Sequence, residues 1–219
     1  MKKYYILIFL LFLLNSFVSA QAQSGRKGEM KHTFLCADYT QGIVCIISDE
    51  GKILWQYPAE RCNDIWALPN GDILFNTGNG VKEVTRDKKI VFSYESKSEI
   101  YACQRLSNGN TFIACSDHNG EPRIVEVDQS GKIVWQLSKN ELPGIELKFM
   151  AGMQYLPNGN LLLTNWVGHN EFGNAPHAFE VTREKKVIWL YNDTTFLKTM
   201  SSIQLLDSDA DYMSSSILH

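Results

Sequence analysis

The segment from Asn165 to His177, NWVGHNEFGNAPH, contains the densest group of chemically active side chains in this sequence. Histidine can transfer a proton near neutral pH, tryptophan can stack on a sugar or aromatic ring, and amides and carboxylates can hydrogen-bond to a polar ligand. We therefore expect a ligand-binding segment whose candidate residues are Asn165, Trp166, His169, Asn170, Glu171 and His177. If the protein is an enzyme, His169 and His177 are the candidate general acid or base.

The spacing within this segment does not complete a known catalytic or metal-binding motif. His169 and Glu171 could share a metal ion, yet the H-x-H and H-E-x-x-H patterns that place two histidines around zinc are absent. Elsewhere in the sequence Asp117 and His118 are adjacent to each other, but no serine or cysteine in a nucleophile-elbow motif accompanies them. The alternative is an ordered loop held by its own side chains, with His177 capping the next strand. We expect no metal site.

The rest of the sequence indicates what would position this segment, because it repeats. Four stretches share the pattern of Ile124–Leu137, IVEVDQSGKIVWQL, and aligning Trp55, Phe92, Trp135 and Trp189 gives steps of 37, 43 and 54 residues. Such a period is typical of propellers and solenoids. Since the aromatic residues recur at one position of the unit, we expect them to fill the space between neighbouring units.

A second repeat lies out of phase with the first and consists of ALPNGDILF, RLSNGNTFI and YLPNGNLLL. Asn-Gly between two apolar runs predicts a tight hairpin, here with a type I′ turn in which both central residues have positive φ. Short runs rich in Ile, Val, Tyr, Phe and Trp predict strands, and no stretch predicts a helix of three turns. Each unit therefore has four strands, A to D in chain order.

These units predict an all-β fold, a β-propeller of four-stranded antiparallel blades with four blades from this chain. The first unit begins at His32 without a strand A, and Ser201–Leu206 matches strand A of later units, so we expect the last strand to close the ring. A shortened or open form of a larger propeller is the alternative. The expected division is a signal peptide at 1–22, a flexible leader at 23–31, the propeller at 32–206 and a C-terminal tail at 207–219.

The connections within each blade differ in length. In a four-stranded blade the A–B and C–D turns lie on one face, and the B–C and D–A connections lie on the other. Here the first set is short and regular, while the second is long and irregular and includes the segment from Asn165 to His177. Function on a regular scaffold concentrates in irregular loops. We therefore expect the site on the loop-rich face and in the central channel beneath it.

Strand A carries a recurring position whose side chains are mostly amides. The equivalent residues are Trp66, Gln104, Gln154 and Gln204. Their amides would line the channel or satisfy backbone groups between sheets, and the second role is the commoner one for buried amides. Residues just before this position would lie near the channel mouth and are further candidate ligand contacts: Asn63, Asp64 and Tyr101.

The N-terminal residues and the charge limit the classes of function. Lys2 and Lys3, an apolar run from Tyr4 to Leu14 and small residues at Ala20 and Ala22 form the pattern of a secretory signal peptide, which is too short to span a bilayer. We expect an exported, periplasmic or extracellular protein with no membrane span. The formal net charge of −3 at pH 7 makes nucleic acid an unsuitable partner.

Five cysteines occur in the sequence. Their odd number and the absence of a C-x-x-C spacing argue against a zinc site or a dense disulfide framework. Cys36 and Cys45 fall on consecutive strands of one hairpin and could face each other, and the export of the protein would allow them to oxidise. The alternative is a pair of small buried side chains.

The LPNGN turn at 156–160, the EVDQSGKIVW stretch at 126–135 and the SIQLLD stretch at 202–207 resemble secreted propellers grouped as PQQ-like repeat or quinoprotein-like proteins. The resemblance covers roughly Gly42 to Asp207 and implies a propeller, usually with more blades. Quinoprotein dehydrogenases of this superfamily hold PQQ in a wider, eight-bladed ring with calcium. A four-bladed ring lacks that room, so we expect no PQQ and no other cofactor.

The function expected from the sequence is that of an exported binding module. Its loop-rich face would bind a small polar molecule, a glycan or a protein. One alternative is a hydrolase, lyase or transferase acting on glycans or aryl esters through His169 or His177. A second alternative is a purely structural repeat scaffold.

Overall fold

Fifteen strands in antiparallel sheets make up the computed structural model, which describes residues 32–116, 123–168, 173, 175–195 and 197–203. The described residues contain no helix, so the all-β prediction is confirmed. The expected signal peptide, leader and tail lie outside these residues.

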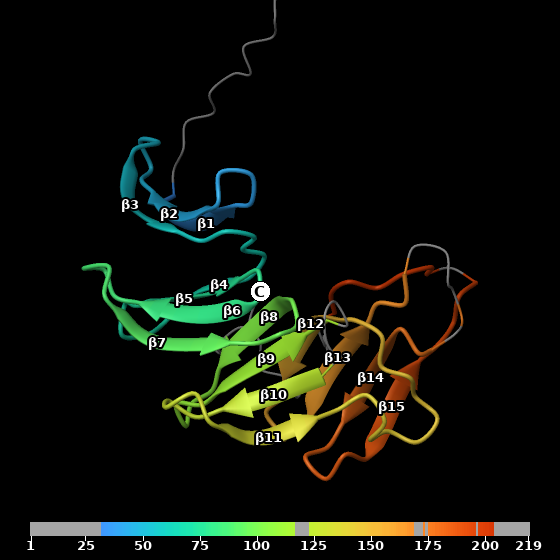
Figure 1. Cartoon of the computed structure of the whole chain (residues 1–219). Helices are drawn as coiled ribbons and strands as arrows, with labels where there is room; N and C mark the ends of the chain where they lie inside the picture. Colours follow the sequence, from blue (N-terminus) through green and yellow to red (C-terminus); the bar gives the residue numbers. More distant parts are fainter. Residues whose placement is uncertain (1–31, 117–122, 169–172, 174, 196, 204–219) are drawn as a thin grey trace, which may run out of the picture.

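Four sheets follow one another along the chain and correspond to the four predicted units (Figure 1). Blade one has three strands: β1 (Phe34–Asp38), β2 (Ile43–Ile47) and β3 (Ile53–Pro58). Blade two has four: β4 (Ile65–Ala67), β5 (Ile73–Thr77), β6 (Gly80–Val84) and β7 (Ile90–Glu95). Blade three consists of β8 (Ile100–Arg105), β9 (Thr111–Cys115), β10 (Arg123–Val127) and β11 (Ile133–Leu137). Blade four consists of β12 (Met150–Tyr155), β13 (Leu161–Asn165), β14 (Ala178–Val181) and β15 (Val187–Tyr191).

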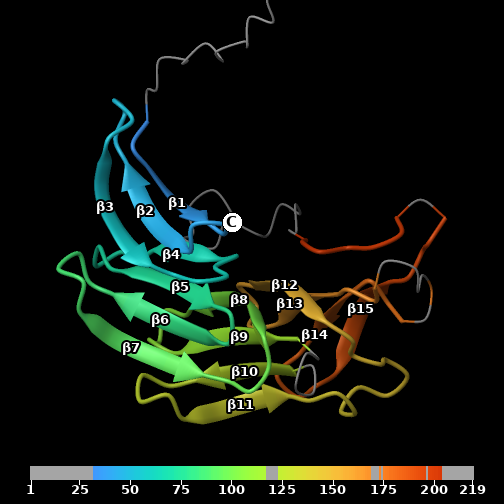
Figure 2. The same ribbon diagram turned by 45° about the horizontal axis from the view of Figure 1, so that its top comes forward.

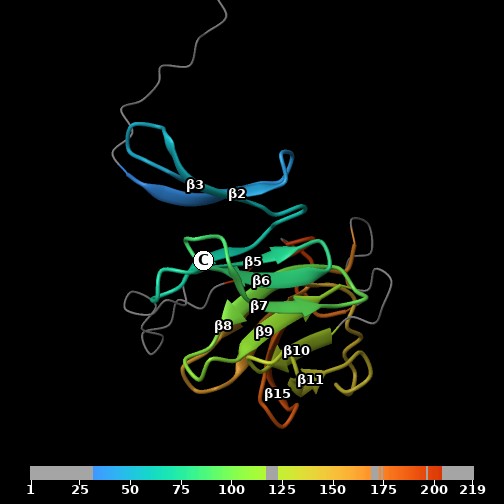
Figure 3. The same ribbon diagram turned by 60° about the vertical axis from the view of Figure 1, so that its left-hand side comes forward.

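The blades are arranged as an arc around a shared centre, as expected for a propeller (Figure 2). Strands β4, β8 and β12 lie innermost, and β3, β7, β11 and β15 form the outer rim. Packing between blades joins neighbours in sequence: β1 contacts β4, β5 and β6 contact β8, and β8 and β9 contact β12. Figure 3 shows blade one as a separate layer over blade two.

Three apolar clusters hold the arc together, one at each junction between neighbouring blades. Because successive residues of a strand point to opposite faces, a middle strand contributes to two junctions. In β5, Phe75 packs toward blade one and Leu74 packs toward blade three. Complete burial of such a side chain stabilises the fold by about 1.5 to 3 kcal/mol. The blades therefore depend on their neighbours for stability.

The repeated aromatic position fills the space between blades at three of its four occurrences. Trp55 is 7% exposed, Phe92 is 5% exposed, and Trp135 packs against the cluster between blades three and four. Trp189 does not follow the prediction, because 43% of its surface is exposed. In the described part of the chain no further blade packs against the face on which Trp189 lies.

The Asn-Gly hairpins have a different turn from the predicted type I′. In the first, the N–H of Gly71 donates to the carbonyl of Leu68 at 2.8 Å, so Pro69 and Asn70 are the central residues. Gly71 follows with a φ of +88°, while Asn70 has no positive φ. This is a type I turn followed by a bulge, and Pro69 favours it because its ring fixes φ near −65°. The prediction of hairpins was right, but that of their turn type was wrong.

Closure of the ring is not seen in the described residues. β1 pairs with β2 alone, and residues 204–206 of the expected closing strand lie outside the description. The described residues Ser201 and Ser202 lie instead against Gly152 of β12. Closure by Ser201–Leu206 therefore stays a prediction.

Candidate functional site

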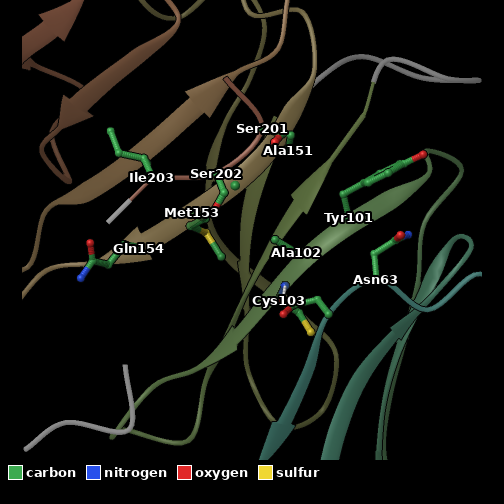
Figure 4. A pocket seen from close by; sticks show the side chains of 12 residues that line it. Asn63, Tyr101, Ala102, Cys103, Ala151, Met153, Gln154, Ser201, Ser202 and Ile203 are labelled. Carbon is green, nitrogen blue, oxygen red and sulfur yellow. Dashed lines mark hydrogen bonds between the residues drawn. The ribbon is translucent and has the colours of Figure 1, made fainter. Parts of the chain in front are cut away.

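A cavity of about 580 Å³ lies at the centre of the arc, where the inner strands begin at the loop-rich face. Its wall comes from the starts of β4, β8 and β12 and from residues 201–203. Figure 4 shows Asn63 and Tyr101 on one side, Ser201 and Ser202 on the other, and Ala102 between them. The cavity lies in the predicted central channel.

The cavity exists because most side chains at one repeated position are small. Asp64, Ala102, Gly152 and Ser202 each precede the recurring strand A position by two residues, and all four line the cavity. Among them only Asp64 carries a charge. The result is a single carboxyl group facing a wall of small side chains and backbone.

The Asp64 backbone is fixed by a buried amide. The Oδ1 atom of Asn76 accepts hydrogen bonds from the N–H groups of Asn63 and Asp64, both at 2.8 Å. The Nδ2 atom of Asn76 donates to the carbonyl of Ile100 at 2.7 Å. Asn76 thereby connects the loop before β4 to the start of β8, and it sets the position from which Asp64 enters the cavity.

The Asp64 side chain is buried and ties two blades together. Its Oδ2 atom accepts the backbone N–H of Cys103 at 2.7 Å. Burial raises the pKa of the carboxyl to about 7, although hydrogen bonds from Cys103 and the Trp66 side chain favour the charged form. Asp64 therefore changes its charge near neutral pH, so it can accept hydrogen bonds from a ligand when ionised and donate one when protonated.

An aromatic row leads from the cavity rim to the predicted binding segment. The Tyr101 and Phe149 rings are 4.6 Å apart at an interplanar angle of 65°. Phe149 and Trp166 follow at 5.3 Å and 70°. Tyr101 and Trp166 were both candidate residues, and the structure brings them together through Phe149, which sequence reasoning missed. No repeat position or motif singled out Phe149.

The thiols beside the cavity are not suited to nucleophilic chemistry. Burial raises the pKa of Cys62 to about 12 and that of Cys103 well above its ordinary value. The thiolate is the reactive form of cysteine, so both groups are inert at neutral pH. In the described part of the chain, His, Cys, Asp and Glu side chains form no cluster of three or more that could hold a metal ion.

Two candidate amides have structural roles. Gln104 is buried between blades, where its Oε1 atom accepts the N–H of Tyr155 at 3.1 Å. Asn165 is fully buried and holds the loops of blade four, because its Oδ1 atom accepts the N–H of Lys148 at 2.7 Å and its Nδ2 atom donates to the carbonyl of Glu146 at 3.0 Å. The Gln104 bond is of the commoner kind expected for the strand A glutamines, and Gln104, a candidate ligand contact, is not among the residues that line the cavity. Gln154 is also buried and lines the cavity.

His177 extends the sheet of blade four beyond β14. Its N–H donates to the carbonyl of Tyr191 at 2.9 Å, and its carbonyl accepts the N–H of Asn165 at 2.8 Å. The imidazole has no exposed surface, and His177 is not among the residues that line the cavity. This arrangement matches the strand-capping alternative. His169, Asn170, Glu171 and Gln204, together with the Asp117–His118 pair, lie outside the described residues.

Comparison with known proteins links the chain to solved structures only. No family model and no curated protein matches it. A Bacteroides caccae protein of unknown function is 21% identical, with a TM-score of 0.39 over 77% of this chain and 96% of that one. BamB from Moraxella catarrhalis is 17% identical, with a TM-score of 0.48 over 73% of this chain and 46% of its own. The Neurospora crassa Pan2 WD40 domain is 11% identical, with a TM-score of 0.48 over 69% of this chain and 48% of its own.

The chain thus spans about half the length of the BamB and Pan2 chains. The propeller assignment rests on the four antiparallel sheets and their arc. A search of the described residues for a helix long and apolar enough to cross a membrane found none.

Proposed function

We propose that this protein is an exported, non-catalytic propeller that binds a small polar molecule in its central cavity. The observation that carries the proposal is the cavity of about 580 Å³ at the loop-rich face, which four of the candidate residues line: Asn63, Asp64, Tyr101 and Gln154. Pockets of roughly 300 to 1,000 Å³ are typical of small-molecule sites.

The chemistry of the wall limits the ligand. Asp64 supplies one buried carboxyl group that can meet a ligand hydroxyl or ammonium group. Tyr101 stands at the rim with Phe149 and Trp166 behind it, an aromatic row suited to a sugar ring or a planar group. A sugar or an amine-bearing sugar would use both features. A glycan whose terminal unit enters the cavity belongs to the same class.

The enzymatic alternative receives less support. Its candidate bases were His169 and His177, and of these the described one, His177, is fully buried in the sheet extension. A general base must come within hydrogen-bond reach of the proton that it removes. We therefore propose binding without catalysis, without a quinone cofactor, and with the PQQ-like resemblance limited to the repeat scaffold.

A melting-temperature screen with neutral sugars, amino sugars and small amines tests this proposal. We expect a hit to raise the melting temperature because a ligand that binds only the folded state stabilises it. The shift should fall strongly in Asp64→Asn and in Asn63→Ala. Asp87→Asn, on an exposed turn of the opposite face, is the matched control and should keep the full shift. If no compound raises the melting temperature, or if the shift is unchanged in both cavity variants, the purely structural scaffold is favoured.

A further inference from the structure

The same pair of contacts, an indole hydrogen bond and a cation–π contact, occurs at two of the junctions between blades. The indole Nε1 of Trp55 in blade one donates to the carbonyl of Arg86 in blade two at 2.9 Å. Trp135 in blade three makes the same bond with the carbonyl of Arg183 in blade four, also at 2.9 Å. In both pairs the guanidinium lies over the ring, 5.6 Å from the Trp55 centroid and 4.7 Å from that of Trp135. A tryptophan on the outer strand therefore binds the arginine turn of the following blade.

At two junctions a glutamate of one blade forms an ion pair with an arginine of the next blade. Glu126, which lies opposite Trp135 in the β10–β11 pair, forms an ion pair of 2.5 Å with Arg183. At the junction of blades two and three, where the aromatic residue is Phe92, Glu83 pairs with Arg105, whose guanidinium lies 4.8 Å from the Phe92 centroid. In both cases a ring and a carboxylate of one blade contact a guanidinium of the next blade. Arg183 comes from an outer turn, whereas Arg105 comes from the inner strand β8.

Blade four has the equivalent ring and carboxylate, those of Trp189 and Glu180, but no arginine of the described residues contacts them in the same way. Glu180 lies opposite Trp189 in the β14–β15 pair, as Glu126 lies opposite Trp135. The Oε1 atom of Glu180 accepts the amide of Asn160 at 2.7 Å within its own blade, and no cation of the described residues forms an ion pair with it. Trp189 is 43% exposed, whereas Trp55 is 7% exposed.

The charge of blade one makes it a poor partner for this face. Alignment of the outer turns places Asp49 of blade one where Arg86 and Arg183 stand in blades two and four. Ring closure, or head-to-tail docking of a second copy, would bring Asp49 toward Glu180 and set two negative charges against each other. The two arginine turns of this chain are already engaged with Trp55 and Trp135.

We propose that the face formed by Glu180 and Trp189 binds an arginine-bearing β-turn of a partner protein that is itself built from propeller blades. The arginine pairs with Glu180 and covers Trp189, and the turn carbonyl accepts the indole N–H. The face thus reproduces the junction seen between blades three and four, and the partner's turn takes the place of the arginine turn of a following blade. This surface lies on β14 and β15 of blade four and is separate from the central cavity.

The indole N–H signal of Trp189 in a heteronuclear NMR spectrum of the whole protein tests the proposal. Trp189→Phe identifies the signal by its loss. The probe is a cyclised hairpin peptide with the sequence of residues 84–91, VTRDKKIV, and the control peptide carries Arg86→Ala. We expect a saturable shift of the Trp189 signal with the arginine peptide, about fivefold weaker binding to Glu180→Gln because an ion pair is lost, and no saturation with the alanine peptide.

Other outcomes overturn the proposal. Equal shifts with both peptides, or none with either, would show that the face does not recognise an arginine turn. A Trp189 signal that moves with protein concentration alone, together with dimers in sedimentation, would assign the face to a second copy. A Trp189 N–H protected from exchange in the dilute monomer would show that the chain covers the face itself, which is the result expected if Ser201–Leu206 closes the ring.

Discussion

The carboxylate of Asp64 accepts the backbone N–H of Cys103 at 2.7 Å, which links the inner strands of blades two and three beside the central cavity. This bond holds a titratable group in a buried place, where its pKa rises from 3.8 to about 7. Since one carboxyl group serves both the junction and the cavity wall, stability and ligand binding should respond to pH together.

The stability contributed at Asp64 should decrease as pH rises from about 4 to about 7. In that window the folded state holds a proton that the unfolded state has lost, so unfolding becomes more favourable with increasing pH. The full effect is at most roughly 4 kcal/mol, given about 1.4 kcal/mol for each pKa unit. Denaturant unfolding of the protein and of Asp64→Asn between pH 4 and 8 measures it. We expect the variant to gain stability relative to the parent as pH rises; parallel curves would contradict the buried carboxyl.

Replacing Trp135 by alanine should destabilise the protein by about 3 to 5 kcal/mol, the usual range for a core aromatic residue. The ring packs edge-on against Phe112 at 5.8 Å and its indole bonds to Arg183. Trp189→Ala is the matched control, because it changes the same repeat position on an exposed face and should cost about 1 kcal/mol or less. Equal losses in chemical unfolding would mean that Trp189 is buried in solution.

The scaffold was more predictable from the sequence than the site. Hydrophobic alternation and the Asn-Gly turns depend on local chemistry, so the strands and the blade count could be derived. The turn type could not be derived from the Asn-Gly pair alone. The first two hairpins make the same turn with Pro69 in one and Ser107 in the other, and in both the glycine, not the asparagine, has the positive φ. The meeting of Phe149 with Tyr101 could not be derived, because Phe149 lies in a connection outside the repeat. The exposure of Trp189 depends on which blade follows, and a repeat position carries no information about that.

Lys88→Gly should stabilise the protein by about 0.5 to 1 kcal/mol. Lys88 has a φ of +66°, a conformation that costs a side-chain-bearing residue about 1 to 2 kcal/mol, and part of that gain is lost to the greater freedom of glycine in the unfolded chain. Gly131 occupies the equivalent turn position in blade three with a φ of +83°. Gly131→Ala is the reverse control and should lower the melting temperature. A destabilised Lys88→Gly would show that the lysine side chain contributes more than its backbone strain removes.

Cys36 and Cys45 should form a disulfide when the protein meets an oxidised small-molecule disulfide such as oxidised glutathione. They are register partners on β1 and β2, and their sulfur atoms lie 3.4 Å apart. One cysteine thiolate attacks the reagent, which releases one reagent thiol and leaves a mixed disulfide. The second cysteine then displaces the remaining reagent thiol, so the protein transfers two electrons and two protons.

Burial and the neighbouring Cys36 raise the pKa of Cys45 to about 11, so its thiolate is scarce at neutral pH and the reaction should accelerate as the pH rises. Mass spectrometry with thiol alkylation measures the product, and Cys36→Ser should abolish it. Oxidation confined to Cys103 or Cys115 would contradict the pairing.

Gly152→Ala should loosen the segment that closes one side of the cavity. A Cβ atom at this position would lie 2.8 Å from the carbonyl oxygen of Ser201, closer than packed structures show, and 3.0 Å from the Cα of Ser202, closer than most Cβ contacts. The Gly152 N–H also donates to Thr164 Oγ1 at 2.7 Å, so the strand cannot easily move away. Overpacking of this kind costs about 1 to 3 kcal/mol.

Ala102 stands at the equivalent position of blade three, where a methyl group is accommodated, so Ala102→Gly is the matched control and should leave the segment in place. Limited proteolysis between residues 197 and 203 should become faster in Gly152→Ala alone, together with weaker binding of any ligand found in the melting screen. If proteolysis is unchanged while the melting temperature falls, the strain is absorbed within β12, and Ser201 and Ser202 do not form part of the cavity wall in solution.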